Sequence, residues 1–336
     1  MNGAAQEPKP SSTKALGVAR GILRNENTVL VLILLAIVAG VAILSKGVSL
    51  SPKNISNIVL FSAPVGLVAI GQFFVILTAG IDLSVGGIAV MCVLLGGRLM
   101  TLMVAKQVFA HPLPVYQAVL AMLLAGLLVG AFNGSLVSRV GVPALIVTIG
   151  TWIMSKGGGL LISMGSIYEL PRELAFLGQG YLLGIPVPIL ILGIVFAIAY
   201  FALYHTPYGR AVYAVGGNPM AAYISGINIK NVLLSVYMIS GVLAGLASVL
   251  LLARTLVATN VMAKGLELDS IAACVLGGIS LAGGRGGLIG VIIGTLIIAT
   301  INNGIIVLAI DPSFQDLIRG IVIFAAVTID SWRRSK

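Results

Sequence analysis

Long runs of apolar residues alternate with short polar connections along most of the chain. A hydrocarbon core about 30 Å thick needs roughly 17–25 apolar residues per helix, and this rule divides the runs into about ten expected membrane-spanning helices. Their bounds are Thr28–Ser45, Ile55–Ala79, Val85–Ala105, Tyr116–Val140, Ala144–Ile162, Ile185–Tyr204, Val232–Leu252, Leu268–Ala282, Leu288–Ala309 and Phe314–Ile329. Ala144–Ile162 contains polar residues and Leu268–Ala282 is short, so either could be a broken or partly re-entrant helix.

The longest polar interruption that carries helix signals is Tyr204–Lys230. Within it, Asn218 can cap a helix by accepting a hydrogen bond from a backbone N–H. Pro219 suits the first helical position, because proline lacks a backbone N–H and an N–H at that position would have no partner within the helix. Gly226 can adopt the left-handed conformation that ends a helix. A helix of about two turns is not stable alone in water, so the sequence predicts that this one lies on a protein surface.

Composition places the chain in a membrane. Of its 336 residues 59% are hydrophobic and 9% are charged, whereas a soluble domain has about 25% charged residues. The formal net charge of +10 does not indicate a nucleic-acid partner, because the basic residues are scattered at the ends of the apolar runs. Cys92 and Cys274 lie inside apolar runs, and two cysteines exclude a disulfide framework. We therefore expect an all-α polytopic membrane protein.

Lysine and arginine positions predict the orientation. A run of ten spans puts both termini on one side, and eleven basic residues fall on that side against six on the other, which indicates cytoplasmic termini. The basic N-terminal segment and the apolar run after it resemble a signal sequence, but no clean cleavage site follows. We therefore expect the first span to remain uncleaved. The expected parts are a cytoplasmic N-terminal tail (1–27), a first transmembrane half (28–204), a cytoplasmic coupling loop (205–231), a second transmembrane half (232–330) and a cytoplasmic tail (331–336).

A weak internal repeat relates the two halves. The segment Gly80–Ser84 recurs as Gly265–Ser270, and each copy is followed by Cys-Val-Leu and paired glycines. Asn133-Gly134 is matched later by Asn303-Gly304. On the predicted topology the two copies begin spans of opposite direction, which indicates inverted-topology halves of the kind found in many transporters. The alternative is that glycine-rich apolar helices look alike by composition.

Asp82 and Ser84 are candidates for a functional helix break. A carboxylate inside a membrane is costly and is usually paired or functional, and the glycines around Asp82 let the backbone unwind where it faces protein or water. One interpretation is a break that lines a central translocation pathway. The other is that Asp82 or Ser84 caps the following helix. Glu267 and Asp269 allow the same two interpretations, with capping favoured.

Intramembrane asparagines are a second group of candidates, because an amide can either join two helices or bind a polar solute. The candidate pathway residues are Asp82, Ser84, Asn133, Asn302 and Asn303.

No pattern indicates catalysis. His111 and His205 lie in separate loops, no carboxylate pair shares a helix face within a span, and zinc-protease, nucleophile-elbow and P-loop motifs are absent from the sequence. We expect no catalytic residue and no metal ligand. If the protein moves a solute by ATP hydrolysis, the ATPase must be another polypeptide.

Three segments together resemble a known family. They are Gly80–Gly86, the loop positions Gly209–Ala211, Ala214, Gly216, Asn218, Ala221-Ala222 and Ser225–Ile227, and the run Val275–Gly278 with Gly283–Gly286. These resemble the inner-membrane permease subunits of ribose-type bacterial ABC importers, a family that also covers xylose, arabinose, galactose and autoinducer-2 uptake. The resemblance extends over about residues 28–330.

The resemblance implies partners and a docking helix. It implies a second copy of the permease in a homodimeric pore, paired ABC-type ATPase subunits or a tandem ATPase, and an extracytoplasmic solute-binding protein, all at a bacterial inner membrane. ATP and Mg would be bound by the partner subunits, with no cofactor in this chain. Asn218–Gly226 resembles the coupling helix that docks on the ATPase, or else is a linker helix packed on its own subunit. The ATPase-coupling residues are then Gly209, Arg210, Asn218, Pro219, Ala221, Ala222, Ser225 and Gly226.

The function expected from these observations is that of a permease subunit of an ATP-driven importer for a monosaccharide or similar small neutral solute. A lining sparse in charge fits a neutral solute. One alternative is an ion-coupled secondary transporter, which usually needs intramembrane carboxylates or histidines, and only Asp82 is a candidate. A membrane scaffold or receptor is the other alternative. The resemblance does not name the solute, because in this family the binding protein largely selects it.

Overall fold

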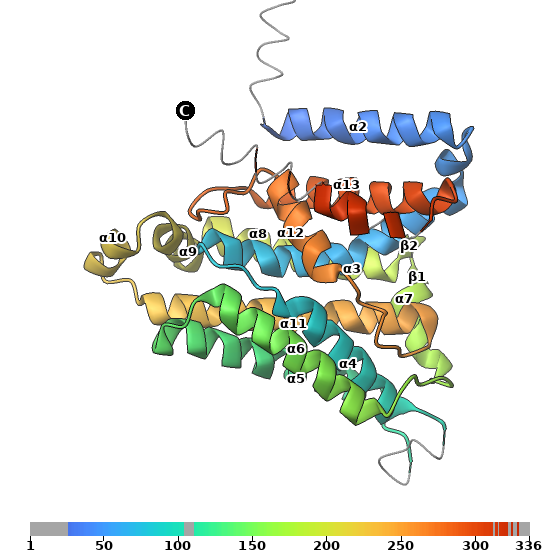
Figure 1. Cartoon of the computed structure of the whole chain (residues 1–336), viewed down its shortest axis with the longest axis horizontal. Coiled ribbons are helices and arrows are strands. Elements are labelled where there is room, and N and C mark those ends of the chain that lie inside the picture. The colour runs from blue at the N-terminus through green and yellow to red at the C-terminus, as the bar shows by residue number, and fades with distance from the viewer. Residues whose placement is uncertain are drawn as a thin grey trace, which may run out of the picture.

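Apolar helices make up most of the computed structural model, which describes residues 26–103, 111–311, 313, 314, 316–321, 324 and 328 (Figure 1). The expected N-terminal tail up to residue 25, the C-terminal tail 331–336 and several positions of Phe314–Ile329 lie outside the described residues. The long helices of the described part are α2 (Glu26–Leu44), α3 (Pro52–Leu77), α4 (Ser84–Met100), α5 (Val115–Ser135), α6 (Ala144–Ser163), α8 (Val187–His205), α11 (Ile229–Thr255) and α13 (Leu288–Val307).

Shorter elements connect these helices. They are the 3₁₀ turns η1 (Val48–Leu50) and η4 (Arg172–Leu174), the π-helical turn η3 (Leu136–Val140), and the helices α7 (Ala175–Gln179), α9 (Pro207–Gly217), α10 (Pro219–Ile224) and α12 (Leu266–Leu276). Strands β1 (Tyr181–Leu182) and β2 (Ile185–Pro186) form one antiparallel hairpin. In Figure 1, α9 and α10 lie at one end of the helical body, and the hairpin with α7 lies at the other.

Within the described residues, seven helices are long and apolar enough to cross a membrane: α2, α3, α5 with η3, α6, α8, α11 and α13. This confirms the expected all-α polytopic architecture. Helix α4 is apolar but has only 17 residues. Ala144–Ile162, expected as a possible broken span, lies in one continuous helix, and the Thr148 and Thr151 hydroxyls donate to backbone carbonyls of that helix.

Local signals explain where the helices begin and end. Helix α3 begins at Pro52 because the Ser51 hydroxyl accepts the Asn54 N–H, and α11 begins after Asn228, which accepts the Asn231 N–H at 3.1 Å. Helix α12 ends at Leu276, earlier than the expected Ala282. The reason is the following Gly277-Gly278, where Gly278 has φ +83° and leaves the helical region.

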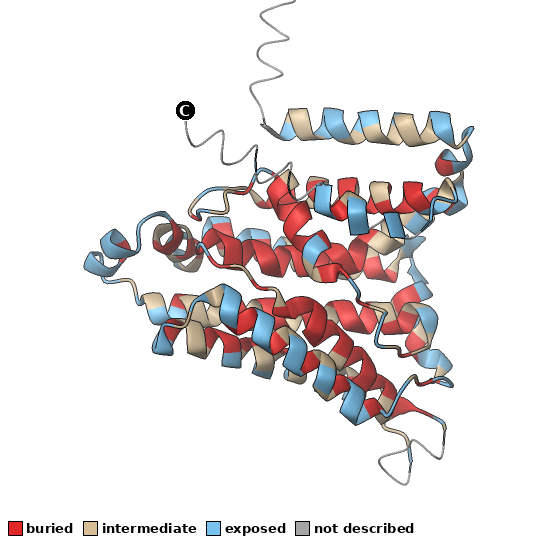
Figure 2. Ribbon diagram, viewed as in Figure 1, coloured by how far each residue is buried: buried red, intermediate tan, exposed pale blue. Residues whose placement is uncertain are grey.

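Helices α3 and α11 form the centre of the molecule. In the apolar 18-residue stretch of each helix, 78% of the residues are buried in α3 and 72% in α11, against 22–28% in α5, α6 and α8. Figure 2 shows the same division, with buried residues concentrated on the inner helices and exposed ones on the outer helices. The outer helices keep apolar side chains exposed, as expected of surfaces that face lipid.

The two central helices pack across the two halves of the chain. Helix α11 packs against α5 and α4, while α3 packs against α13 and α12, and α3 and α11 also touch each other. The contact between α5 and α11 is close because Gly126 and Gly241 face each other, and a Cβ at Gly126 would overlap the Gly241 carbonyl oxygen. Each half therefore receives the central helix of the other.

Candidate functional site

Asp82, in the connection between α3 and α4, is fully buried. Its Oδ1 accepts hydrogen bonds from the Ser84 backbone N–H at 2.9 Å and from the Ser84 hydroxyl, and its Oδ2 accepts one from the Ser240 hydroxyl on α11 at 2.7 Å. With its amide oriented to suit, Gln72 on α3 donates to the Asp82 carbonyl oxygen at 3.0 Å and accepts from the Asp82 N–H at 3.1 Å. The connection is thus tied to both central helices.

The hydrogen bonds continue from Ser84 to two more helices. Asn133 on α5 donates from Nδ2 to the Ser84 hydroxyl at 2.8 Å, and the Thr151 hydroxyl on α6 donates to Asn133 Oδ1 at 2.7 Å. The structure therefore brings together three of the expected pathway residues, Asp82, Ser84 and Asn133. All three are buried inside the chain, and the Asp82–Ser84 N–H bond is the contact that the capping interpretation requires.

Asp82 has no ion-pair partner among the described residues. A buried carboxylate without a cation is costly unless hydrogen bonds replace its lost water. The three donors from Ser84 and Ser240 provide those bonds and fix the first turn of α4.

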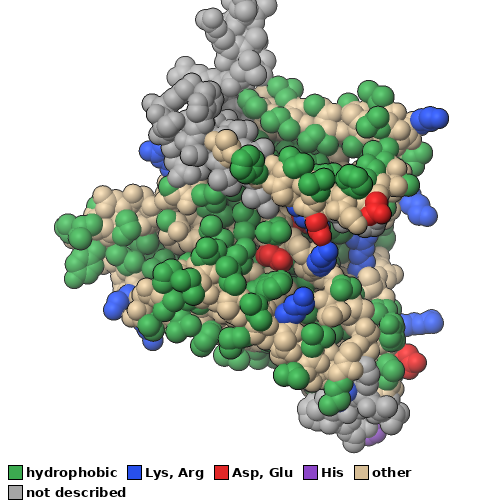
Figure 3. Space-filling model, in the orientation of Figure 1, with side chains coloured by type: hydrophobic (Ala, Val, Ile, Leu, Met, Phe, Trp, Pro, Cys, Tyr) green, Lys and Arg blue, Asp and Glu red, His purple; other side chains and the backbone are tan. Residues whose placement is uncertain are grey.

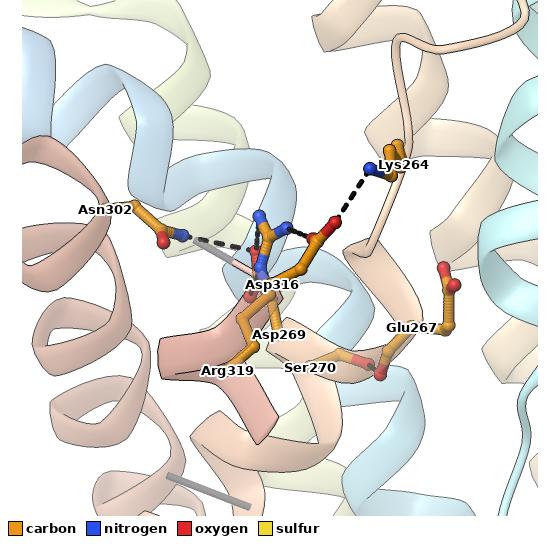
Figure 4. Close-up of polar contacts among 7 residues, drawn as sticks. All are labelled: Lys264, Glu267, Asp269, Ser270, Asn302, Asp316 and Arg319. Atoms are coloured by element: carbon orange, nitrogen blue, oxygen red, sulfur yellow. Dashed lines mark hydrogen bonds and ion pairs between the residues drawn. The ribbon is translucent and has the colours of Figure 1, made fainter. Parts of the chain in front are cut away.

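A second polar cluster surrounds Asp269 on α12 (Figure 4). Arg319 donates from Nε to Asp269 Oδ1 at 2.7 Å and from Nη2 to Asp269 Oδ2 at 3.1 Å, and Asn302 on α13 donates to Asp269 Oδ2 at 3.2 Å. The side chains of Arg319 and Asp269 are only 10% and 3% exposed. A bidentate arginine–carboxylate ion pair is among the strongest side-chain interactions. It therefore holds the segment around Arg319 against α12 and α13.

Alternating charges extend this cluster toward the surface. Arg319 Nη1 contacts Asp316 at 3.0 Å, and Asp316 contacts the Lys264 ammonium at 2.8 Å. The second pair is exposed, with side-chain exposures of 69% for Lys264 and 54% for Asp316. Figure 4 shows the chain of contacts leading from Lys264 through Asp316 and Arg319 to Asp269 and Asn302.

Asn303 lies in a separate contact. Its amide and the amide of Asn54 on α3 exchange two hydrogen bonds, from Asn54 to Asn303 at 2.8 Å and back at 3.0 Å. The neighbouring asparagines of α13 thus join different helices. Both are buried.

Sequence reasoning did not single out the partners of these residues. Gln72, Ser240, Asn54 and Arg319 are 10 to 249 positions away from the groups they bind in the chain. The only available signal was that each is a polar residue inside an apolar run, which marks a residue in need of a partner without naming it.

At one end of the molecule, α9 and α10 form the expected docking region. Asn218 Oδ1 accepts the Ala221 N–H at 3.0 Å, Pro219 is the first residue of α10, and Gly226 has φ +81°. The helix and its cap therefore confirm the local prediction. Whether this helix contacts an ATPase stays a prediction.

The exposed face of α10 is apolar. Met220, Tyr223 and Ile224 are 67%, 69% and 77% exposed, whereas Ala222 is only 3% exposed and packs against its own chain. Among the other expected coupling residues, Arg210, Ala221, Ser225 and Gly226 are exposed and Gly209 is buried. An exposed apolar face on a short projecting helix indicates a surface for another protein, and it consists of the larger side chains, not of Ala222.

A glycine junction connects this region to the end of α3. A Cβ at Gly216 would overlap the Leu77 carbonyl oxygen, and the Gly284 N–H donates to that same oxygen at 2.9 Å. The Tyr213 hydroxyl donates to the Gly286 carbonyl at 2.8 Å, and burial together with the neighbouring Tyr204 raises the pKa of the Tyr213 phenol. The C-terminal end of α9 therefore contacts the end of α3, directly before the connection that holds Asp82.

Within the described residues, no group of three or more His, Cys, Asp or Glu side chains is placed to hold a metal ion. Cys92 and Cys274 are both free and fully buried.

Comparison with known proteins identifies relatives over most of the chain. The Haemophilus influenzae protein named ribose import permease protein RbsC is 35% identical, over 97% of this chain and 98% of its own length. The D-allose transport system permease protein AlsC of Escherichia coli K12 is 39% identical, over 89% of each chain. The xylose transport system permease protein XylH of H. influenzae is 31% identical, over 92% of this chain and 96% of its own.

No solved structure matches the chain. The family described as "Branched-chain amino acid transport system / permease component" matches residues 54–327, which include every polar contact of Asp82 and Asp269 and the whole of α9 and α10. The chain belongs to this family of transport permeases.

Proposed function

We propose that the chain is the transmembrane permease subunit of an ATP-driven importer for a monosaccharide or a similar small neutral solute. The observation that carries the proposal is that relatives matched over 89–97% of this chain are named as permeases for ribose, D-allose and xylose. The family description speaks of branched-chain amino acids, so the choice of a sugar rests on the relatives.

The proposed assembly supplies what this chain lacks. A second copy completes the pore, an extracytoplasmic binding protein delivers the solute, and ABC-type ATPase subunits bind ATP and Mg, with no cofactor in the permease. The apolar side chains Met220, Tyr223 and Ile224 on α10 support docking of an ATPase, because exposed apolar patches are typical of interaction sites. The chain itself catalyses no reaction.

The proposed topology has ten spans in two inverted halves, with residues 205–231 and both termini in the cytoplasm of a bacterial cell with an inner membrane. The exchange of α3 and α11 between the halves supports this arrangement, since α3 packs on α12 and α13 as α11 packs on α4 and α5. Inverted repeats of this kind are common in transporters.

In the proposed mechanism, ATP closes the ATPase pair, α10 moves with it, and the two halves rock about the crossing of α3 and α11. The glycine junction of Gly216, Leu77 and Gly284 supports a direct mechanical route from α9 to the connection that holds Asp82. Asp82, Ser84, Asn133, Asn302 and Asn303 are proposed pathway residues that act by holding the helix starts in place, since all five are buried.

The test is uptake by proteoliposomes that contain the complete importer. Labelled ribose, D-allose, xylose and leucine are supplied outside, with ATP or a non-hydrolysable analogue inside. We expect ATP-dependent uptake of at least one sugar and none of leucine. Uptake driven by a proton gradient without ATP would contradict the proposal and favour an ion-coupled transporter, and uptake of leucine alone would contradict the choice of a sugar.

A further inference from the structure

Trp152 and Lys156 lie near the middle of α6. They are the ninth and thirteenth of its 20 residues, so each is more than about 10 Å from either end of the helix. The Lys156 Nζ lies over the Trp152 ring, 5.2 Å from its centroid, and both residues are half-buried. Helix α6 is long and apolar enough to cross a membrane, so this cation and this aromatic ring are at depth.

Glu267 approaches the same place from α12. A Cβ at Gly86, in the first turn of α4, would overlap Oε2 of Glu267 and would lie 3.4 Å from Nε1 of Trp152. Oε2 has no hydrogen-bond partner among the described residues. Figure 4 shows Glu267 pointing away from the Asp269–Arg319 pair. The carboxylate and the indole N–H therefore both lie close to Gly86, where α4 has no side chain.

Lys156 and Glu267 are the two oppositely charged side chains of this cluster. Lys156 and Glu267 carry opposite formal charges, but the two form no ion pair in the described part of the chain. Together they are electrically neutral. A cluster of hydrogen-bonding groups whose formal charges cancel suits an uncharged polar occupant better than an ion.

The depth of this cluster requires an explanation. Charged side chains within a membrane face the protein interior or a water-filled cavity, and Figure 3 shows acidic and basic side chains gathered near the middle of one face, surrounded by hydrophobic ones. Helices α4 and α12 both begin close to this point, at Ser84 and Leu266. In transporters, helices that begin inside the membrane commonly build the solute site.

We infer that Trp152, Lys156 and Glu267 form a contact site for the hydroxyl groups of a monosaccharide in transit, at the point where Gly86 lets the Glu267 carboxylate approach α4. This inference rests on the proposed function and adds to it the residues that the sugar meets. None of the three belongs to the pathway residues expected from the sequence.

The chemistry of the three side chains fits a neutral polyol. The Glu267 carboxylate accepts hydrogen bonds from hydroxyl groups, while the Trp152 N–H and the Lys156 ammonium donate to hydroxyl oxygens. The apolar face of the indole packs against the C–H face of a sugar ring. Few contacts and a half-open position give the weak binding that a pathway needs if the solute is to leave again.

Binding can be measured without transport. The sequence has two tryptophans, so Trp332→Phe leaves Trp152 as the only indole in the permease. We expect ribose, D-allose or xylose to change the Trp152 fluorescence saturably in the complete importer held in nanodiscs, and we expect Glu267→Gln to weaken this response by about tenfold, because a hydrogen bond to a charged group is lost. Glu26→Gln, at the first residue of α2, is the matched control and should leave the response unchanged.

Transport gives the second readout. Trp152→Phe keeps the apolar ring and removes the N–H, and Glu267→Gln keeps the shape and removes the charge, so both variants should fold. We expect sugar uptake to fall by about tenfold while ATP hydrolysis stimulated by the binding protein is retained.

The outcomes separate the two proposals. If the unmodified importer takes up sugar, but both variants do so within twofold of it and sugar leaves the fluorescence unchanged, the contact site is wrong and the proposed function stands. If the unmodified importer takes up no sugar, the proposed function fails, and the contact site fails with it.

Discussion

The Arg319 guanidinium donates two hydrogen bonds to the Asp269 carboxylate, from Nε at 2.7 Å and from Nη2 at 3.1 Å. The two residues are 50 positions apart. Because both side chains are buried, their charges have exchanged water for each other, and neither can be removed without leaving the other unpaired. The pair therefore joins the segment around Arg319 to α12 in a way that a surface ion pair would not.

Asp269→Asn is expected to destabilise the protein by about 3–5 kcal/mol, because the buried Arg319 loses its counter-charge. The double variant Asp269→Leu with Arg319→Leu should recover much of this loss, since it leaves no buried charge. Thermal unfolding in detergent measures both. Lys264→Gln breaks only the exposed Lys264–Asp316 pair and should cost less than about 1 kcal/mol. Equal losses for Asp269→Asn and Lys264→Gln would contradict this account.

Asp82→Ala should both destabilise the protein and lower uptake, because Ser84, Ser240 and Asn133 lose the group around which their hydrogen bonds are arranged. Ser240→Ala removes one donor and should cost about 1–3 kcal/mol. Unfolding and uptake are measured on the same preparations. Normal uptake by a destabilised Asp82→Ala protein would leave Asp82 with the capping role alone.

Gly216→Ala should separate ATP hydrolysis from uptake, or prevent folding, because the new Cβ would overlap the Leu77 carbonyl oxygen. Gly217→Ala is the matched control, since a Cβ there meets nothing within 4 Å. Both variants add one methyl group to the same short segment. The comparison uses sugar uptake and ATP hydrolysis in parallel, and similar behaviour of the two variants would show that the junction does not transmit motion.

Ile224→Asp should abolish stimulated ATP hydrolysis and uptake while the permease remains folded, because Ile224 is 77% exposed on the apolar face of α10 and a charge there opposes docking through that face. Ile224→Leu keeps an apolar side chain at this position and should therefore retain both activities. By contrast, Ala222→Trp should disturb folding, since Ala222 is buried in its own chain and overpacking costs about 1–3 kcal/mol. Co-purification of the ATPase with Ile224→Asp at the normal ratio would argue against docking at α10.

A cysteine at Met220 should react with an impermeant maleimide only from the cytoplasmic side, because α10 is expected there. The matched position is Leu183, 96% exposed in the hairpin at the other end of the molecule, where a cysteine should react only from outside. The native Cys92 and Cys274 are fully buried and need not be replaced. Labelling of both positions from the same side would overturn the topology.

The sequence predicted the helices well and their polar contacts poorly, for a physical reason. Hydrophobic length decides whether a segment crosses a membrane, and Asn218, Pro219 and Gly226 act on neighbours within one helix, so both kinds of signal are local. The partner of Asp269 is distant in the chain, and in the sequence Arg319 is recognisable only as a cation inside an apolar run. Ala222 also reads as a docking residue until the packing of α10 shows that it faces inward.

The same limit explains why the sequence favours a capping role for Glu267. Its position two residues before Asp269, at the start of a helix, is typical of a capping carboxylate. Only the packing of α12 on α4 places it over Gly86 and beside Trp152, and the glycine there looks from the sequence like any other of the 42.

The exchange of α3 and α11 has a consequence for biosynthesis. Helix α3 leaves the ribosome early, yet its neighbours α12 and α13 are made more than 180 residues later. Until then the side of α3 that packs on α12 and α13, with Asn54, has no permanent partner. The membrane insertase must therefore shelter a nascent chain with an incomplete interior until translation is nearly finished, and a chain truncated before α12 cannot reach the native packing.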